Sequence, residues 1–118
     1  MKNRLLSILL VLLMALTLLP LGALAEGDNK CGEDLTWNLD EIGILTISGT
    51  GDMYNYSEEP APWSEYSDII TSITIDYGVT SIGTSAFTGC SNVQQINIPD
   101  SVEHIDPYAF SFCNGLHT

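Results

Sequence analysis

A 23-residue repeat in the second half of the chain restricts its fold more than any other feature. The pattern Ile70-x-x-Ile73-x-Ile75 recurs as Val93-x-x-Ile96-x-Ile98. The same offset relates Val79 to Val102, Ile82 to Ile105, Ala86-Phe87 to Ala109-Phe110, and Cys90 to Cys113. A period of this length is typical of architectures in which small units stack and bury their apolar faces against their neighbours.

The first two parts of each repeat are expected to be extended. Segments 70–75 and 93–98 are rich in β-branched residues with apolar positions at spacing two, which predicts a short strand. Segments 79–82 and 102–105 carry apolar residues three apart, which predicts an extended or turn-like stretch.

The third part of each repeat predicts about one turn of helix. Segments 84–90 and 107–113 carry Ala-Phe followed three residues later by Cys, and Pro107 sits at a natural helix start. A strand, a return stretch and a single helical turn cannot bury their apolar faces alone, whereas stacked rungs can. The repeat therefore predicts a β-rich α/β solenoid built from 23-residue units.

Residues 26–66 differ from the repeats and predict an amino-terminal cap. Segment 35–39 alternates apolar and polar residues, segment 42–48 does so in part, and 40–43 supplies a four-residue turn. This pattern indicates an antiparallel β-hairpin that shields the first rung. Gly49-Thr50-Gly51 is expected to end the second strand.

A stiff, polar linker over 58–62 is expected to join this hairpin to the repeats. Trp63 and Tyr66 follow it and are expected to close the first rung. We expect Trp37 and Trp63 to be largely buried, because both lie among apolar residues in an otherwise acidic segment.

The repeats resemble the BspA-like family of leucine-rich repeats found in bacterial surface proteins. The likeness rests on Val-x-x-Ile, Ala-Phe and Cys within the period, throughout YGVTSIGTSAFTGCSNVQQINIPDSVEHIDPYAF. The upstream CGEDLTWNLDEIGILTISGTGDMYNY, with Pro62-Trp63 after it, looks like the cap that often precedes such repeats. Pro99-Asp100-Ser101 stands where the commonest leucine-rich pattern has an Asn. The resemblance implies adhesion or a host-facing interaction.

Residues 67–118 contain two full units and the start of a third, because Leu116 falls in register with Ile70 and Val93. Solenoids generally need about three or more units. We therefore expect further repeats in the natural protein. The isolated segment 26–118 is expected to be marginally stable and to self-associate through an open edge.

Residues 1–25 predict a secretory signal peptide. Lys2 and Arg4 precede an apolar run over 5–19, and Ala23-Leu24-Ala25 supplies the small residues of a cleavage site after Ala25. The run is short for a membrane span. The protein is thus expected to be secreted or held at the cell surface, with no membrane span after cleavage.

Charge excludes one large class of partner. The chain from residue 26 onward keeps all 15 acidic residues but only Lys30 as a base, so its net charge is 1 − 15 = −14. A surface without basic patches cannot neutralise phosphates, which excludes nucleic acid as a partner and disfavours anionic membranes.

No catalytic or metal-binding pattern emerges from the residue types. The segment 49–51 lacks the third Gly and the Lys of a phosphate loop. His104 and Asp106 occupy polar repeat positions, and no nucleophile is specified beside them. The three cysteines lie 59 and 23 residues apart, without C-x-x-C spacing. We therefore expect no enzyme activity, no cofactor and no metal.

Two states of the cysteines remain open. Cys90 and Cys113 share one repeat position, so neighbouring rungs would bring them within disulfide range. Alternatively, each is a small buried apolar residue, which the parallel direction of equivalent Cβ atoms favours. Cys31 is expected to pack in the cap.

Two functions are compatible with these features. The first is a secreted or cell-surface protein that binds an extracellular or host-surface protein through its exposed strand face. On that face Ser72, Thr74, Gln95 and Asn97 alternate with the buried isoleucines. The second is a non-catalytic amino-terminal appendage of a larger secreted enzyme, such as a peptidase or glycosidase. The ligand is not specified by the sequence.

Overall fold

A computed structural model describes residues 29–116, and the predicted signal peptide lies outside them. The strands are β1 (Lys30–Leu39), β2 (Ile44–Met53), β3 (Ser72–Ile75), β4 (Val79–Ile82), β5 (Gln95–Asn97) and β6 (His104–Ile105), and a 3-10 helix, η2, covers Ser64–Tyr66. Within this part of the chain, no helix has the length and apolar character needed to cross a membrane.

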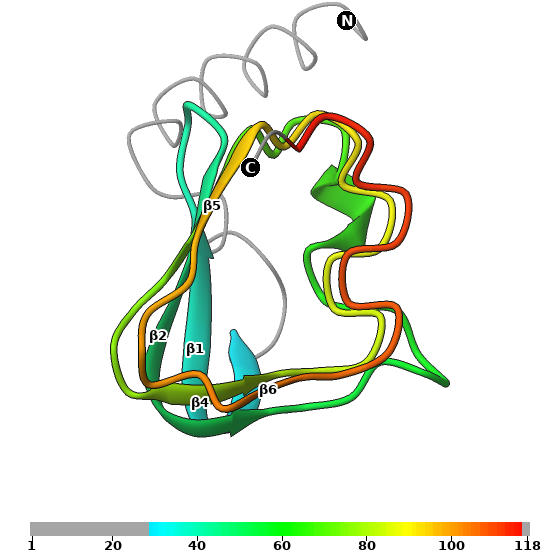
Figure 1. Cartoon of the computed structure of the whole chain (residues 1–118). Helices are drawn as coiled ribbons and strands as arrows, with labels where there is room; N and C mark the ends of the chain where they lie inside the picture. The colour runs from blue at the N-terminus through cyan, green and yellow to red at the C-terminus, as the bar shows by residue number, and fades with distance from the viewer. Residues whose placement is uncertain (1–28, 117–118) are drawn as a thin grey trace, which may run out of the picture.

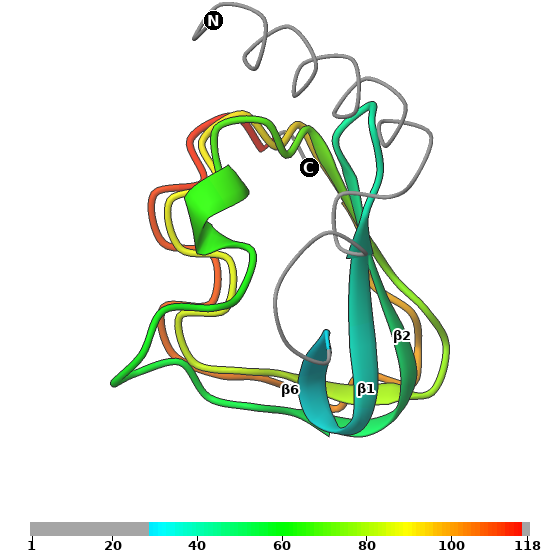
Figure 2. The same ribbon diagram turned by 180° about the vertical axis from the view of Figure 1, so that it is seen from behind.

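The strands form one sheet that curls around two sides of the molecule, in the order β5-β3-β2-β4-β6, with β1 paired to β2. Viewed along the stack, the chain follows a three-sided path (Figure 1), and the same three sides are visible from behind (Figure 2). β3 and β5 lie on one side, β4 and β6 on the second, and turns form the third. Successive passes of the chain lie over one another on all three sides.

Strand pairing relates residues that are 23 positions apart. β3 and β5 are parallel, with Ser72 opposite Gln95 and Thr74 opposite Asn97. β4 and β6 are also parallel, and Ile82 lies opposite Ile105. Equivalent apolar side chains therefore stack from one rung to the next.

β2 contributes to both sides of the curled sheet. It pairs antiparallel with β1 and parallel with β3, where Leu45 lies opposite Ile73. Beyond Ser48 it turns the corner and pairs with β4, where Gly51 lies opposite Val79. The expected end of this strand at Gly49-Thr50-Gly51 is therefore wrong. The glycines bend the strand instead, with φ of 119° at Gly49 and 98° at Gly51, which other residues rarely adopt.

The expected helical turns at 84–90 and 107–113 are wrong, so the helical component of the predicted α/β class is very small. Both segments form successive turns. Ser85 and Tyr108 have φ of 58° and 62°, and Gly89 and Phe112, four residues later, have φ of 81° and 62°. A left-handed residue at such short intervals prevents a right-handed helix from continuing.

Hydrogen bonds still join the rungs along this third side. The N–H groups of Ser85, Phe87 and Gly89 donate to the carbonyl oxygens of Pro107, Ala109 and Ser111, at 3.1, 2.8 and 2.8 Å respectively. All three bonds run in the same direction between rungs. The turns therefore stack as specifically as strands do.

The core fills the space between the three sides and continues from the hairpin into the repeats. It contains Cys31, Leu35, Trp37, Leu39, Leu45, Ile47, Met53, Ala61, Trp63, Ile70, Ile73, Ile75, Val79, Ile82, Ala86, Phe87, Cys90, Val93 and Ala109. The predicted burial of both tryptophans is confirmed, with Trp37 3% and Trp63 0% exposed.

Aromatic rings form a column inside the third side. Trp63 stacks on Phe87 with ring centroids 5.4 Å apart, and Phe87 stacks on Phe110 at 5.5 Å. Trp37 and Tyr56 meet Trp63 edge-on, at 5.9 and 5.8 Å. Such contacts add to the stabilisation that burial of the rings already provides.

Candidate binding surfaces

The four residues predicted to bind a ligand lie together on the outer face of β3 and β5. Ser72 and Gln95 form one cross-strand pair, and Thr74 and Asn97 form the next. Gln95 and Asn97 are exposed, whereas Ser72 and Thr74 are half-buried. The inward alternation of Ile73 and Ile75 fixes this orientation, because successive side chains of a strand point to opposite faces.

The polar face continues onto the hairpin, which the sequence-based prediction missed. Thr46 of β2 lies opposite Thr74, and Asn38 of β1 lies opposite Thr46. A single row of uncharged polar residues thus crosses four strands, from Asn38 through Thr46 and Thr74 to Asn97. The alternation of segments 35–39 and 42–48 indicates which hairpin residues face outward. Only the parallel pairing of β2 with β3 joins the outer face of the hairpin to that of the repeats.

Carboxylates lie at the borders of this face and are held by neighbouring groups. The Ser48 hydroxyl donates to Asp76 at 2.8 Å. Asp40 accepts from the backbone N–H groups of Ile42 and Ile44 at 3.0 and 2.9 Å, which fixes the hairpin turn. Thr80 donates to Asp52 where β2 and β4 meet. The face is therefore neutral at its centre and acidic at its edges.

The histidine and cysteine side chains of the described residues lie in separate parts of the structure. Among residues 29–116, no group of three or more His, Cys, Asp or Glu side chains is arranged to hold a metal. His104, in β6, is exposed. The cysteines are thiols in this structure. Desolvation raises the pKa of Cys31 and of Cys90 from 9.0 to about 12, so both stay protonated and unreactive at neutral pH.

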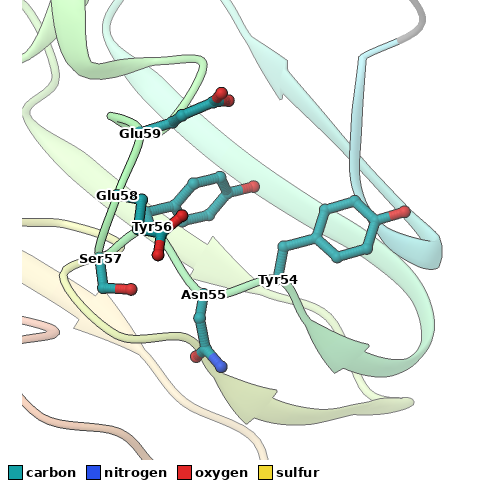
Figure 3. A pocket seen from close by; sticks show the side chains of 6 residues that line it. All are labelled: Tyr54, Asn55, Tyr56, Ser57, Glu58 and Glu59. Carbon is teal, nitrogen blue, oxygen red and sulfur yellow. The ribbon is translucent and has the colours of Figure 1, made fainter.

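A second surface feature is a pocket of about 380 Å³ beside the junction of hairpin and repeats. It is lined by Tyr54, Asn55, Tyr56, Ser57, Glu58 and Glu59. These six residues form the loop that follows β2 (Figure 3). No motif in the sequence indicates this pocket, because its walls come from one short segment without a recognisable spacing.

Comparisons with known proteins place these features in context. Residues 65–118 match the family described as "BspA type Leucine rich repeat region (6 copies)". A crystal structure of a leucine-rich repeat protein from Eubacterium ventriosum ATCC 27560 is similar, with 32% sequence identity and a TM-score of 0.67. The similarity covers 70% of this chain and 22% of that protein, so the chain spans about a fifth of its relative. No curated protein matches the chain.

Proposed function

Residues 65–118 are leucine-rich repeats of the BspA type, and we propose on this premise that the protein is a non-catalytic protein-binding module. The observation that carries the proposal is the aligned polar face of β3 and β5. Ser72 and Thr74 have short side chains, which lose little conformational freedom when a partner orders them. Gln95 and Asn97 are exposed and offer both donors and acceptors.

The hairpin of β1 and β2 serves in this proposal as the amino-terminal cap of a solenoid with 23-residue rungs. Residues 26–66 form the cap and linker, and residues 67–118 form the repeats. Two contacts support this role. β2 pairs with the first rung on two sides, and Trp63 reaches the third side, where its indole N–H donates to the Ala86 carbonyl at 2.8 Å.

The place of action is proposed to be outside the cell or at its surface. BspA-type repeats are typical of surface or secreted bacterial proteins, and a net charge of −14 after residue 25 favours solubility there. The partner is accordingly an extracellular or host-surface protein, and the activity is adhesion-like. A non-catalytic role at the amino-terminal end of a larger secreted enzyme would use the same face.

A pair of double variants tests the role of the sheet face. Thr74→Arg with Asn97→Arg places two long cations on neighbouring rungs of the face. Ser91→Arg with Asn114→Arg places the same charges 23 residues apart but outside the sheet, where both residues are exposed. Retention of the labelled protein on intact host cells is the measurement.

We expect the face variant to lose retention by about tenfold or more, because unmatched charges at an interface cost several kcal/mol. The control variant should retain the protein as the wild type does. Equal retention of both variants, or no retention of the wild type, would contradict the proposal.

A further inference from the structure

Asn114 and Gly115 form an exposed turn in the rung that contains β5 and β6. The Leu116 N–H donates to the Cys113 carbonyl at 3.3 Å, which places Asn114 and Gly115 at the two central positions of the turn. Asn114 is exposed and Gly115 is half-buried. Neither the Asn114 side chain nor the Gly115 N–H makes a hydrogen bond within residues 29–116. No hydrogen bond in this part of the chain therefore holds the two groups apart.

The exposure of Asn114 does not depend on its position in the second rung. The equivalent residue of the preceding rung, 23 positions earlier, is Ser91. Ser91 is exposed although the next rung stacks beside it. We therefore expect Asn114 to remain in contact with water when a further rung follows.

Packing against the preceding rung explains why glycine follows Asn114. A Cβ at residue 115 would lie 2.7 Å from the Ser91 carbonyl oxygen and 2.9 Å from the Val93 carbonyl oxygen. Such contacts are too close for any residue with a side chain, so only glycine fits without a shift of the chain. Glycine also leaves its own backbone nitrogen without a neighbouring side chain to shield it. The fold thus requires the least shielded nitrogen directly after an exposed asparagine.

The other exposed asparagines lack this combination. The side-chain oxygen of Asn55 accepts a backbone N–H at 2.9 Å, and the side-chain amide of Asn92 donates to a backbone carbonyl at 2.6 Å. Asn97 ends β5 and precedes a β-branched residue, whose side chain crowds the following nitrogen. Among the asparagines of residues 29–116, only Asn114 is exposed, without a hydrogen bond and followed by glycine.

We propose that Asn114 is a site of spontaneous deamidation in the folded protein, with water as the co-reactant. The backbone nitrogen of Gly115 attacks Cγ of Asn114, so that a new C–N bond forms and the Cγ–Nδ2 bond breaks. Ammonia leaves with the proton that the Gly115 nitrogen gives up, and a cyclic imide remains. Water then opens the imide at Cγ to give aspartate, or at the backbone carbonyl carbon to give isoaspartate.

Both products alter the rung. Each adds one negative charge, so the net charge of the chain from residue 26 changes from −14 to −14 − 1 = −15. Isoaspartate also routes the main chain through Cβ and Cγ, which lengthens the backbone where residue 115 packs against Ser91 and Val93. We expect the isoaspartyl form to stack less closely on the preceding rung and to unfold at lower urea. This inference does not depend on the function proposed for the sheet face.

Incubation of the folded protein in water enriched in ¹⁸O tests the proposal. Digestion after glutamate, in ordinary water, then releases Asn55 in peptide 42–58, Asn92 and Asn97 in peptide 66–103, and Asn114 in peptide 104–118. We expect mass spectrometry to show loss of the amide nitrogen and gain of ¹⁸O in peptide 104–118, and neither change in the other two. The heavy oxygen marks reactions that precede digestion.

The rate in a synthetic peptide 104–118 distinguishes a reaction of the folded state from one that needs unfolding. We expect Asn114 in the folded protein to react within about tenfold of its rate in the peptide, a difference in barrier of no more than roughly 1.4 kcal/mol. A reaction confined to the unfolded chain would be slower by about a thousandfold or more, because the unfolded fraction of a protein is that small.

Asn114→Gln provides a matched variant, because it keeps the side-chain amide but moves it one carbon away from the Gly115 nitrogen. Ion-exchange chromatography should resolve new acidic species from the incubated wild type and none from Asn114→Gln. Equal urea midpoints of the two fresh proteins are expected, since residue 114 is exposed.

Three results would overturn the proposal: a rate in the folded protein as low as that expected for the unfolded chain alone, equal conversion of Asn55 and Asn114, or the same acidic species from Asn114→Gln. The isoaspartyl species, once separated, should have a lower urea midpoint than fresh protein. An equal midpoint would contradict the expected loosening of the stack.

Discussion

Trp63 allows the contribution of one hydrogen bond between hairpin and repeats to be measured. Its ring is fully buried, and its indole N–H donates to the Ala86 carbonyl at 2.8 Å. The corresponding carbonyl of the next rung, Ala109, accepts from the backbone N–H of Phe87 at 2.8 Å. The indole therefore acts in place of the backbone donor that a preceding rung would supply.

Trp37 provides a matched control for this bond. It is 3% exposed and packs edge-on against Trp63, but its own indole N–H has no partner among residues 29–116. Trp63→Phe and Trp37→Phe remove the same atoms from the same cluster. Only the first leaves a buried acceptor without its donor, whereas the second removes a donor that was already unpaired.

The expected difference follows from these two facts. A buried polar group that loses its partner costs about 1–3 kcal/mol. Trp63→Phe should therefore lower the free energy of unfolding by about 1–3 kcal/mol more than Trp37→Phe does. For a domain of this size, that difference corresponds to roughly 4–24 °C in melting temperature. Trp63→Ala should cost about 3–5 kcal/mol, enough to unfold much of the protein.

Urea denaturation followed by circular dichroism is the suitable assay, because both variants change the tryptophan fluorescence. The midpoint and slope should be compared at one pH and one protein concentration. Equal destabilisation by Trp63→Phe and Trp37→Phe, within about 0.5 kcal/mol, would refute the argument that the indole replaces a backbone donor. An unchanged melting temperature for Trp63→Ala would refute its role in the core.

Further predictions concern the thiols, pH and one glycine. A thiol count on denatured protein, purified without oxidant, should find three free thiols, whereas a count of one would reveal a disulfide, with Cys90–Cys113 the first pair to examine. Because burial raises the pKa of Cys31 and Cys90 from 9.0 to about 12, stability should be fully present below pH about 9 and fall as pH rises toward 12. Urea midpoints at pH 7, 9 and 10.5 would show this fall in stability. A Cys90→Ala variant whose stability falls with pH as steeply as that of the wild type would contradict the prediction. Gly78→Ala should destabilise the protein more than Gly89→Ala. Both glycines have positive φ, but only the new Cβ at residue 78 meets backbone, at 2.5 Å from the Gly49 oxygen. Equal melting temperatures of the two variants would show that this close approach does not affect stability.

The strand part of each rung was predictable from side-chain alternation. Ile73 and Ile75 occur at spacing two with Ser72 and Thr74 beside them, which determines both the strand and the face it exposes. The four candidate site residues follow from the same pattern, and the structure places them side by side. Whether they bind a partner stays a prediction.

The third side could not be predicted because its pattern is ambiguous. Ala-Phe followed by Cys after three residues fits a helical turn as well as a chain of tight turns. The turns form because Ser85, Tyr108 and Phe112 adopt a left-handed backbone conformation. Ser, Tyr and Phe rarely adopt this conformation, so their presence does not predict it. Hydrogen bonds between the two rungs offset the cost of this conformation, and no local pattern in the sequence indicates such bonds.

Glycine was misinterpreted at the corner of β2 for a related reason. Gly49 and Gly51 suggest a break when the segment is considered alone. In the structure, the pairing of β2 with β3 before the corner and with β4 after it keeps the strand continuous. The pocket of Tyr54–Glu59 lies in the loop that follows this part of β2. No local pattern in the sequence indicates this pocket.

The backbone hydrogen bonds between the rungs of the third side all run in one direction, which makes stacking a directional connection. Neighbouring strands in a sheet exchange bonds in both senses, but here one rung presents three donors and the next presents three acceptors. An extra 23-residue rung can be inserted between two existing ones, because each of its edges finds its complement. An inverted rung would set donor against donor or acceptor against acceptor. Engineered chains of this kind can therefore be lengthened by duplication, whereas two of them placed edge to edge about a twofold axis cannot bond along this side.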